Sequence, residues 1–192
     1  MRHIRTITLS AILLSASAII ALAQAPAAPA TPPPPPMHLT TTAFQDGGVI
    51  PPKFTQDAAS PVSPALAWTN PPAGVVSYAL IMHDVDNAGQ KHIDDTLHWM
   101  IFNIPGSATS LPEGVPNTPA LADGSVQFKG RVIGFMGPGF RGNIYHHYVF
   151  ELYALDTKLD LTSDSTRADV LKAMDGHVVG KAAMVGLAHR AM

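Results

Sequence analysis

Cysteine is absent from this chain of 192 residues. Its absence excludes disulfide bonds, metal–thiolate centres, thiol nucleophiles and lipid modification at a cysteine. Basic residues are few as well, because 12 Lys and Arg against 14 Asp and Glu give a formal net charge of −2. No basic cluster can neutralise a row of phosphates, so we expect no nucleic-acid partner. Stability must come from a packed core.

The N-terminal hydrophobic run is short for a transmembrane helix. Residues 7–21 are uncharged and apolar, whereas a bilayer-spanning helix needs roughly twenty such residues. Arg2 and Arg5 precede the run and the triplet Ala21-Leu22-Ala23 ends it, which is the layout of a cleavable secretory signal. We therefore predict a signal peptide at 1–23, a periplasmic or secreted location, and no stable membrane anchor after cleavage.

Two segments are predicted after the cleavage site. Residues 24–38 are dominated by Pro and Ala, a composition that favours extended polyproline II and buries too little apolar surface to fold. We predict a disordered linker there. The cleaved chain would have 192 − 23 = 169 residues, enough for a single domain with a sizeable core, which we place at 39–192.

Long helices are excluded over most of that domain by frequent Pro and Gly pairs. Four apolar segments between these breaks have strand length and are rich in β-branched or aromatic residues: 75–82, 97–104, 126–133 and 147–155. One helix is predicted at about 167–174, with Thr166 as its N-cap and Gly176 at its end. These patterns predict a β-rich fold, either a sandwich or a large sheet with flanking loops.

Histidines are the most informative polar residues. Five of the nine lie near acidic or aromatic residues in the central part of the chain: His83, His92, His98, His146 and His147. Histidines and carboxylates grouped in this way suit anion binding, acid–base catalysis or metal binding.

The acidic candidates follow the first predicted strand. Asp84 and Asp86 lie at its end or in the loop after it, where such residues either form a turn or contribute to a binding site. His98 lies one residue into the next predicted strand, with Trp99 on the opposite face. A buried histidine there needs a hydrogen-bond partner, either a backbone carbonyl or an acid such as Asp84.

The third candidate region is a glycine-rich stretch followed by a strand. Gly137 and Pro138 lie in the stretch, whose backbone amides could approach a bound anion, although it does not match a phosphate-loop pattern. Period-two alternation places His146 and Tyr148 on the same face of the strand. Both side chains can therefore face one cavity.

Three function classes fit these residues. The first is a binding module for a small anionic or phosphorylated ligand, with imidazole N–H, hydroxyl and amide donors around it and an acid that orients a histidine or faces an ammonium group. The second is a metal-independent hydrolase with a His/Asp general base, and the third is a His/Asp metal-binding protein. No Gly-x-Ser-x-Gly elbow or His-Glu-x-x-His motif supports the last two. We favour the binding module, with no catalytic residue and no cofactor.

Several motifs occur in an order that is found in one protein family: Asp84-x-Asp86, His98-Trp99, Asn103-Ile104-Pro105, Leu111-Pro112-Glu113-Gly114, Gly137-Pro138 and His146-x-Tyr148-Val149-Phe150. The chain resembles the phosphatidylethanolamine-binding protein family, most closely its bacterial Raf-kinase-inhibitor-like branch, over about 44–190. Two departures stand out. The acidic motif lacks both prolines that are usual in the family, and residues 139–142 read Gly-Phe-Arg-Gly where a further proline is usual.

The resemblance implies an antiparallel β-sandwich with a large central sheet and one or two short C-terminal helices. It also implies a small pocket at one end for phosphate-like anions or phosphorylethanolamine-type head groups. The positions that would line it are Asp84, Asp86, His98, Gly137, Pro138, His146 and Tyr148. Some relatives inhibit kinases or proteases, but an exported protein would not meet cytoplasmic kinases, so any protein partner would lie outside the cytoplasm.

Overall fold

The computed structural model describes residues 34–88 and 93–190. The predicted signal peptide, most of the predicted linker and the candidate His92 lie outside these residues. The first strand begins at His38, one residue before the predicted start of the domain, and the adjacent Met37 side chain is buried. No helix within the described ranges is long and apolar enough to cross a membrane.

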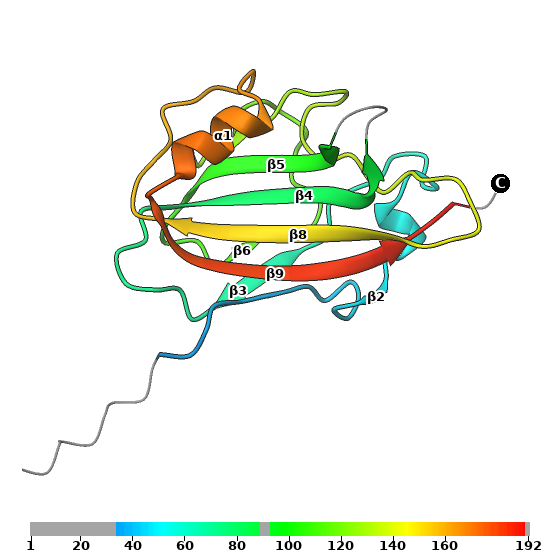
Figure 1. Cartoon of the computed structure of the whole chain (residues 1–192), viewed down its shortest axis with the longest axis horizontal. Coiled ribbons are helices and arrows are strands. Elements are labelled where there is room, and N and C mark those ends of the chain that lie inside the picture. The colour runs from blue at the N-terminus through cyan, green and yellow to red at the C-terminus, as the bar shows by residue number, and fades with distance from the viewer. Residues whose placement is uncertain (1–33, 89–92, 191–192) are drawn as a thin grey trace, which may run out of the picture. The chain divides into compact units, whose positions relative to one another are not determined.

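The described chain is mostly β, with a single α-helix (Figure 1). Its elements in chain order are β1 (His38–Thr40), β2 (Gly48–Val49), the 3-10 helix η1 (Pro52–Phe54), β3 (Leu66–Thr69), β4 (Ser77–Ala88), β5 (Asp95–Pro105), β6 (Ser110–Leu111), β7 (Val126–Gln127), β8 (His146–Leu155), α1 (Arg167–Met174) and β9 (Val178–Ala188). The prediction of a β-rich fold with a short C-terminal helix is confirmed.

These strands form two sheets. The large sheet has the order β2-β9-β8-β4-β5-β7, and the small sheet has the order β1-β3-β6. Every pairing is antiparallel except that of β2 with β9, so the large sheet is mixed and not purely antiparallel as predicted. The parallel pair is only two residues long, because the chain leaves the edge of β9 after Val49 to form η1.

Three of the four predicted strands are confirmed, as β4, β5 and β8. The predicted strand at 126–133 is wrong, because only Val126–Gln127 pair with β5. The chain turns after this pair: the Gly130 N–H donates to Val132 O, and Gly134 has a φ of +77°. The apolar pattern does not predict β9, because Gly and Ala residues interrupt it.

The predicted helix is confirmed as α1, and its caps act as expected. The Thr166 side chain accepts from Asp169 N–H at 3.2 Å, while the Asp169 carboxylate accepts from Thr166 N–H at 2.9 Å, which is a capping box. Gly176 follows the helix with a φ of +80°. Val170 and Met174 pack against one face of the large sheet.

The large sheet is buried on both faces, as its uninterrupted apolar segments predict. In β4, Ile81 belongs to the apolar cluster beneath α1, whereas Met82 belongs to the cluster shared with the small sheet. Alternation continues along the strand, so His83 lies on the α1 side and Asp84 on the small-sheet side. Consecutive residues therefore belong to separate polar networks.

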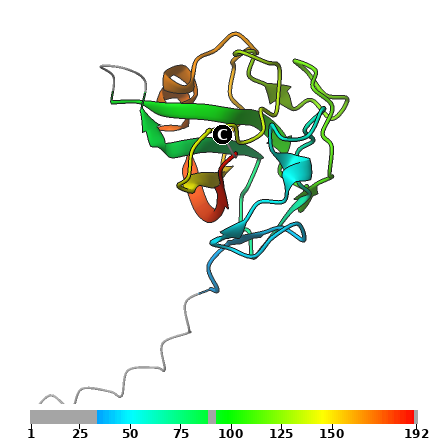
Figure 2. The ribbon, with the colours of Figure 1, turned by 90° about the vertical axis from the view of Figure 1, so that its right-hand side faces the viewer.

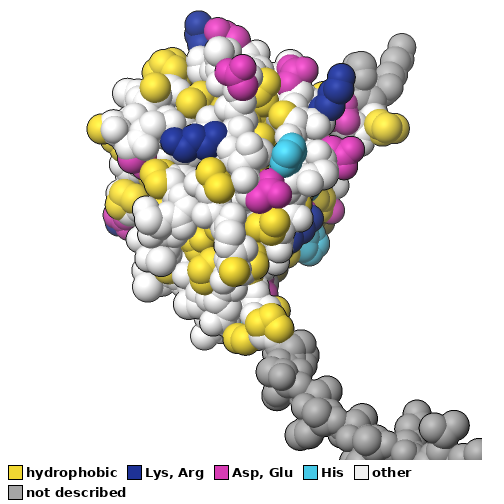
Figure 3. Space-filling model, turned by 90° about the vertical axis from the view of Figure 1, so that its left-hand side faces the viewer, with side chains coloured by type: hydrophobic (Ala, Val, Ile, Leu, Met, Phe, Trp, Pro, Cys, Tyr) yellow, Lys and Arg dark blue, Asp and Glu magenta, His cyan; other side chains and the backbone are white. Residues whose placement is uncertain are grey.

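One end of the molecule gathers most of the candidate residues. The last residues of β4, the first of β8 and the last of β9 lie at the same end of the large sheet, next to η1, and this end faces the viewer in Figure 2. The opposite end, shown in Figure 3, carries scattered charged side chains of both signs.

Candidate functional site

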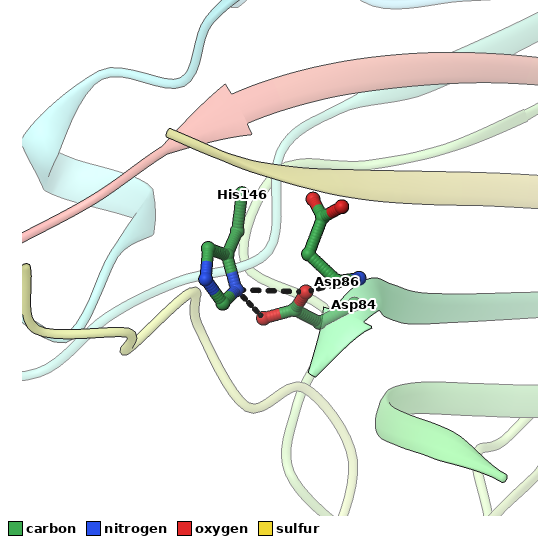
Figure 4. A group of neighbouring side chains, drawn as sticks. All are labelled: Asp84, Asp86 and His146. Carbon is green, nitrogen blue, oxygen red and sulfur yellow. Dashed lines mark hydrogen bonds and ion pairs between the residues drawn. The ribbon is translucent and has the colours of Figure 1, made fainter. Parts of the chain in front are cut away.

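A buried histidine–aspartate pair lies where β4 ends and β8 begins (Figure 4). Asp84 is the register partner of Tyr148, and His146 precedes Tyr148 by two residues, so all three side chains lie on the small-sheet face. Nδ1 of His146 is 2.8 and 3.0 Å from the two carboxylate oxygens of Asp84. The side chains of His146 and Asp84 are only 5% and 1% exposed.

The geometry of this pair places a proton on Nδ1 of His146. A carboxylate accepts hydrogen bonds, so Nδ1–H donates to Asp84, and Nε2 is the ring nitrogen left for a ligand. Asp84 also accepts from the backbone N–H of Asp86 at 3.1 Å. A buried carboxylate is costly unless it is paired in this way. Asp84 therefore orients His146.

A β-bulge turns His98 toward the same place. The register between β4 and β5 skips His98, which is the extra residue of the bulge. Its ring packs edge-on against the Tyr148 ring, with centroids 5.0 Å apart. Strict alternation predicts His98 and Trp99 on opposite faces. That prediction is wrong, because the bulge brings His98 to the small-sheet side, where Trp99 also packs.

His98 is held as a neutral imidazole. Nδ1 lies 2.9 Å from the carbonyl oxygen of Met136, so its partner is a backbone carbonyl and not Asp84, and Nδ1 carries the proton. Burial lowers the pKa of His98, and the bond to Met136 and the charge of Asp84 raise it by less. In this form Nε2 presents a lone pair, an acceptor where an N–H donor was expected.

The Tyr148 hydroxyl is buried and has no hydrogen-bond partner among the described residues. Burial raises the pKa of the phenol and the Asp84 carboxylate raises it further, so the hydroxyl keeps its proton. The backbone amides of Phe140 and Gly139 face it and lower this pKa in part. The Tyr78 hydroxyl and several other buried atoms also lack partners among the described residues, but the Tyr148 hydroxyl is the one whose ring packs against His98 and whose register partner is Asp84.

Gly137 and Pro138 run beside the segment that follows η1. Gln56 bonds both of their carbonyl oxygens, through Nε2 to Gly137 at 2.9 Å and through its backbone N–H to Pro138 at 2.8 Å. A Cβ at Gly137 would lie 2.8 Å from the carbonyl oxygen of Phe54, so only glycine permits this approach. This packing fixes the carbonyl group of the preceding residue, Met136, which accepts the hydrogen bond from the His98 ring.

Asp86 lies at the edge of the site. Because β4 extends to Ala88, Asp86 lies within the last part of the strand and not in a loop after it. Its carboxylate, 39% exposed, accepts from the backbone N–H and from Nδ1 of His147 at 2.6 and 2.8 Å. The bond from the His147 backbone, above all, lowers the pKa of Asp86. Figure 4 shows this carboxylate directed to one side of the Asp84–His146 pair.

Asp84, Asp86 and His146 also have the atoms of a possible metal site, since one ligand atom from each lies within 4.8 Å of the others. Asp84 and His146 are bonded to each other, however, and Asp86 is bonded to His147. A metal ion at Nδ1 of His146 would displace its proton. The arrangement fits an orienting pair better than a metal centre.

His83 lies in a second network, on the opposite face of the sheet. Nδ1 is 2.5 Å from Asp95 and Nε2 is 3.4 Å from Glu151, while Arg167 of α1 bonds the same Asp95. Burial lowers the pKa of His83, but Glu151 and Asp95 raise it by more, so the net direction is upward. The His83 contact, above all, lowers the pKa of Glu151 to about 2. This network joins three strands to α1.

Met136 and Gly139 lie in the predicted glycine-rich stretch but were not among the predicted site residues, and neither was Phe140. Met136 acts through its carbonyl and Gly139 through its amide, and backbone groups leave no mark in the residue type. Phe140 stacks on His146, with ring centroids 3.5 Å apart and planes at 17°. The only available signal for Phe140 was an aromatic residue in a glycine-rich loop that departs from the family pattern.

Sequence comparisons identify close relatives. A family model for phosphatidylethanolamine-binding protein matches residues 40–189. A UPF0098 protein of Methanothermobacter thermautotrophicus is 44% identical over 156 residues, which is 80% of this chain and 99% of that protein. A UPF0098 protein of Aquifex aeolicus is 34% identical over 159 residues, which is 80% of this chain and 89% of that protein.

Solved structures show the same fold. A phosphatidylethanolamine-binding protein homologue from Chlamydia trachomatis superposes with a TM-score of 0.71 at 29% identity, covering 81% of this chain and 98% of that one. Escherichia coli YbcL superposes with a TM-score of 0.68 at 24% identity, covering 80% and 98%. The family model spans every candidate residue of the site. The chain therefore belongs to the phosphatidylethanolamine-binding protein family.

Proposed function

We propose that this protein binds a small phosphate-like anion or a phosphorylethanolamine-type head group at the Asp84–His146 end of a β-sandwich formed by its two sheets. The observation that carries the proposal is the buried Tyr148 hydroxyl, which has no partner among the described residues. His98 packs against the Tyr148 ring, and His146 is bonded to Asp84, the register partner of Tyr148. In each of these histidines Nε2 is the ring nitrogen left for a ligand. Membership of a ligand-binding family supports this location.

The donors and acceptors of this group suit a phosphate that retains one proton. The Tyr148 hydroxyl and the amides of Gly139 and Phe140 can donate to phosphate oxygens. Nε2 of His98 can accept from the remaining P–OH group. A fully ionised phosphate has no P–OH group to donate, so a proton would have to be taken up between it and Nε2 of His98. We therefore expect binding to strengthen as the pH falls through about 6, the usual second pKa of a phosphate monoester.

An amine on the ligand would find negative charge at the edge of the site. Asp86 is 39% exposed there, and its lowered pKa keeps it ionised. The Asp84 carboxylate is already bonded to His146, so Asp86 is the better partner for an ammonium group. We propose that the ammonium group of a phosphorylethanolamine-type ligand lies toward Asp86, while the phosphate lies toward the buried rings.

We also propose export, with residues 1–23 as the signal peptide and 24–38 as a linker. An exported pocket would meet phosphorylated head groups in the cell envelope, and any protein partner that it modulates would be found there. The comparisons favour neither the hydrolase nor the metal-binding alternative.

Calorimetric titration of inorganic phosphate and phosphorylethanolamine tests the proposal. We expect Asp84→Asn and His146→Gln to weaken binding by about tenfold or more, as the loss of one charge-assisted hydrogen bond predicts. The matched control is His177→Gln, because His177 forms an exposed pair with Asp156 at the same 2.8 Å distance. This control should bind as the wild type does.

Two results would contradict the proposal. One is no binding to the wild type at millimolar ligand, and the other is equal binding by the wild type and both site variants. Co-sedimentation with vesicles that contain phosphatidylethanolamine then separates a lipid ligand from a free head group. Circular dichroism of each variant confirms that the comparison is between folded proteins.

A further inference from the structure

A cavity of about 440 Å³ borders the segment that carries Met136 and Gly137. It is distinct from the proposed phosphate site, because neither Asp84 nor His146 is among the described residues that line it. Its lining includes both apolar and polar side chains, which is the composition of a small-ligand site.

This cavity carries a positive charge. Arg131 is the only charged residue among the described residues that line it, so no carboxylate of the protein balances its guanidinium there. Arg167 and Arg190 each bond an aspartate, whereas Arg131 has no such partner among the described residues. An arginine that lines a cavity without a carboxylate attracts an anion from solution.

Asn117 adds neutral donors to the same cavity. Its Oδ1 accepts from the backbone N–H of Phe135 at 3.3 Å, which identifies the side of the amide that bonds to the protein. Nδ2 forms no hydrogen bond with the described residues. The N–H groups of Nδ2 are therefore the part of this side chain that a ligand can use.

A carboxylate with an apolar body matches this combination of groups. The planar guanidinium of Arg131 can donate to both oxygens of a carboxylate, and the Asn117 amide can donate to one of them as well. One positive charge balances one negative charge, whereas a phosphate dianion would keep an excess. Val132, which lines the cavity and is 44% exposed, offers apolar surface that the body of the ligand can cover.

The cavity also shares a wall with the surroundings of His98. A second cavity, of about 230 Å³, is lined in part by His98 and has Arg131 and Met136 in common with the first. Burial, above all, lowers the pKa of His98, and the charge of Arg131 adds to this effect. The guanidinium thus lies near the proposed phosphate site without belonging to it.

We infer that the cavity at Arg131 and Asn117 is a second ligand site, which takes a compact organic carboxylate in addition to the phosphate-like ligand proposed above. The carboxylate accepts from the guanidinium and from Nδ2, and its apolar part packs against Val132. The inference depends on the residues of this cavity alone and goes beyond the proposed function.

Titration of benzoate into protein labelled with ¹⁵N, followed by nuclear magnetic resonance, tests the second site. We expect the backbone amides of 131–137 to shift in a saturable way at millimolar benzoate. Arg131→Gln should weaken binding about fivefold or more, as the loss of a charge-assisted hydrogen bond predicts. The control is Lys129→Gln, which removes an equal charge two residues away, where Nζ lies 3.9 Å from Asp164. This control should bind as the wild type does.

Asn117→Asp separates a binding role from a structural one. The new side chain keeps an oxygen for the Phe135 N–H, but it replaces the Nδ2 donors by a carboxylate oxygen that repels the ligand and can pair with Arg131. We expect it to weaken benzoate binding about tenfold or more, because a donor is lost and a like charge is added. Urea denaturation should show that the variant remains folded.

The outcomes also separate this site from the proposed phosphate site. Equal binding by the wild type, Arg131→Gln and Asn117→Asp, an equal loss in Lys129→Gln, or no saturable shift at tens of millimolar benzoate would overturn the inference. Loss of benzoate binding in His146→Gln would overturn it as well, because benzoate would then occupy the phosphate site. Benzoate binding by a protein that binds neither phosphate nor phosphorylethanolamine would refute the proposed function and leave the second site standing. Every variant is made in the full chain.

Discussion

His98 and His146 are close to the same tyrosine but present different groups to a ligand. His146 donates Nδ1–H to Asp84, whereas His98 donates Nδ1–H to the Met136 carbonyl. Burial lowers the pKa of His98, which favours its neutral form. The residue type alone does not reveal this difference. It depends on which backbone or side-chain group the fold brings to Nδ1.

His83 provides a pH-dependent contribution to stability. Its pKa is raised in the folded state, so protonated His83 stabilises the fold fully below the ordinary value of 6.5, and the contribution is lost as the pH rises through the raised pKa. The pKa of Glu151 is lowered to about 2, so its contribution is present above 4.5 and is lost as the pH falls toward 2. The network is strongest between these limits.

We expect His83→Gln to lower the free energy of unfolding by about 1 to 3 kcal/mol near pH 5.5, because it removes the charge-assisted bond to Asp95 and the ion pair with Glu151. Urea denaturation of both proteins at about pH 5.5 and about pH 9 measures the difference. It should shrink at the higher pH, where His83 is neutral in both states. A difference that stays constant or grows at high pH would show that His83 acts by packing alone.

At the scale of elements, the site depends on how the segment after β7 packs against η1. A Cβ at Gly137 would lie 2.8 Å from the carbonyl oxygen of Phe54 and 3.1 Å from Cβ of Pro61. We expect Gly137→Ala to push the segment away from η1, to cost about 1 to 3 kcal/mol as overpacking does, and to weaken phosphate binding. Urea denaturation and calorimetry measure the two effects.

Gly139→Ala is the comparison for that variant. The three atoms nearest to its new Cβ all belong to the side chain of Gln56, which can move, so we expect a smaller loss of stability. Equal losses in the two variants would mean that the contact with the η1 carbonyl is not what requires glycine at position 137.

The elements that the sequence predicts well carry a regular local signal. Strands β4, β5 and β8 are apolar on both faces because both are covered, and α1 is marked by its caps. The segment at 126–133 has strand-forming residues, but buried Gln127 is drawn into bonds with Trp99 and with the carbonyls of Pro116 and Thr118. The strand stops there, and residue type does not reveal this.

Among the candidate residues, too, those on regular strands are predicted well and those at bulges or in loops are not. Alternation predicts the shared face of His146 and Tyr148, and the structure brings both to Asp84. It does not predict the face of His98, because a bulge changes the count of residues along β5. Nor does it predict the stacking of Phe140, which depends on the path of a loop. Regular strands are readable from sequence, whereas bulges and loops depend on contacts between distant segments.

For the whole molecule, the proposed export would decide which ligands the proposed site can meet. If residues 1–23 form a signal peptide, mass spectrometry of the protein recovered from the cell envelope or medium should show an N-terminus at Gln24. Arg5→Glu, which removes one positive charge from the region before the hydrophobic run, should slow export and leave more precursor in the cytoplasm. Recovery of cytoplasmic protein that retains Met1 through Ala23 as the main species would contradict export.

We propose that the Asp84–His146 end of the sheet binds phosphate. The most direct test is nuclear magnetic resonance of protein labelled with ¹⁵N at histidine, titrated with phosphorylethanolamine. We expect the ring nitrogens of His146 and His98 to shift in a saturable way, while those of His83 and His177, which lie in other networks, do not. Saturable shifts confined to His83 or His177, or no shift of any histidine at millimolar ligand, would contradict it.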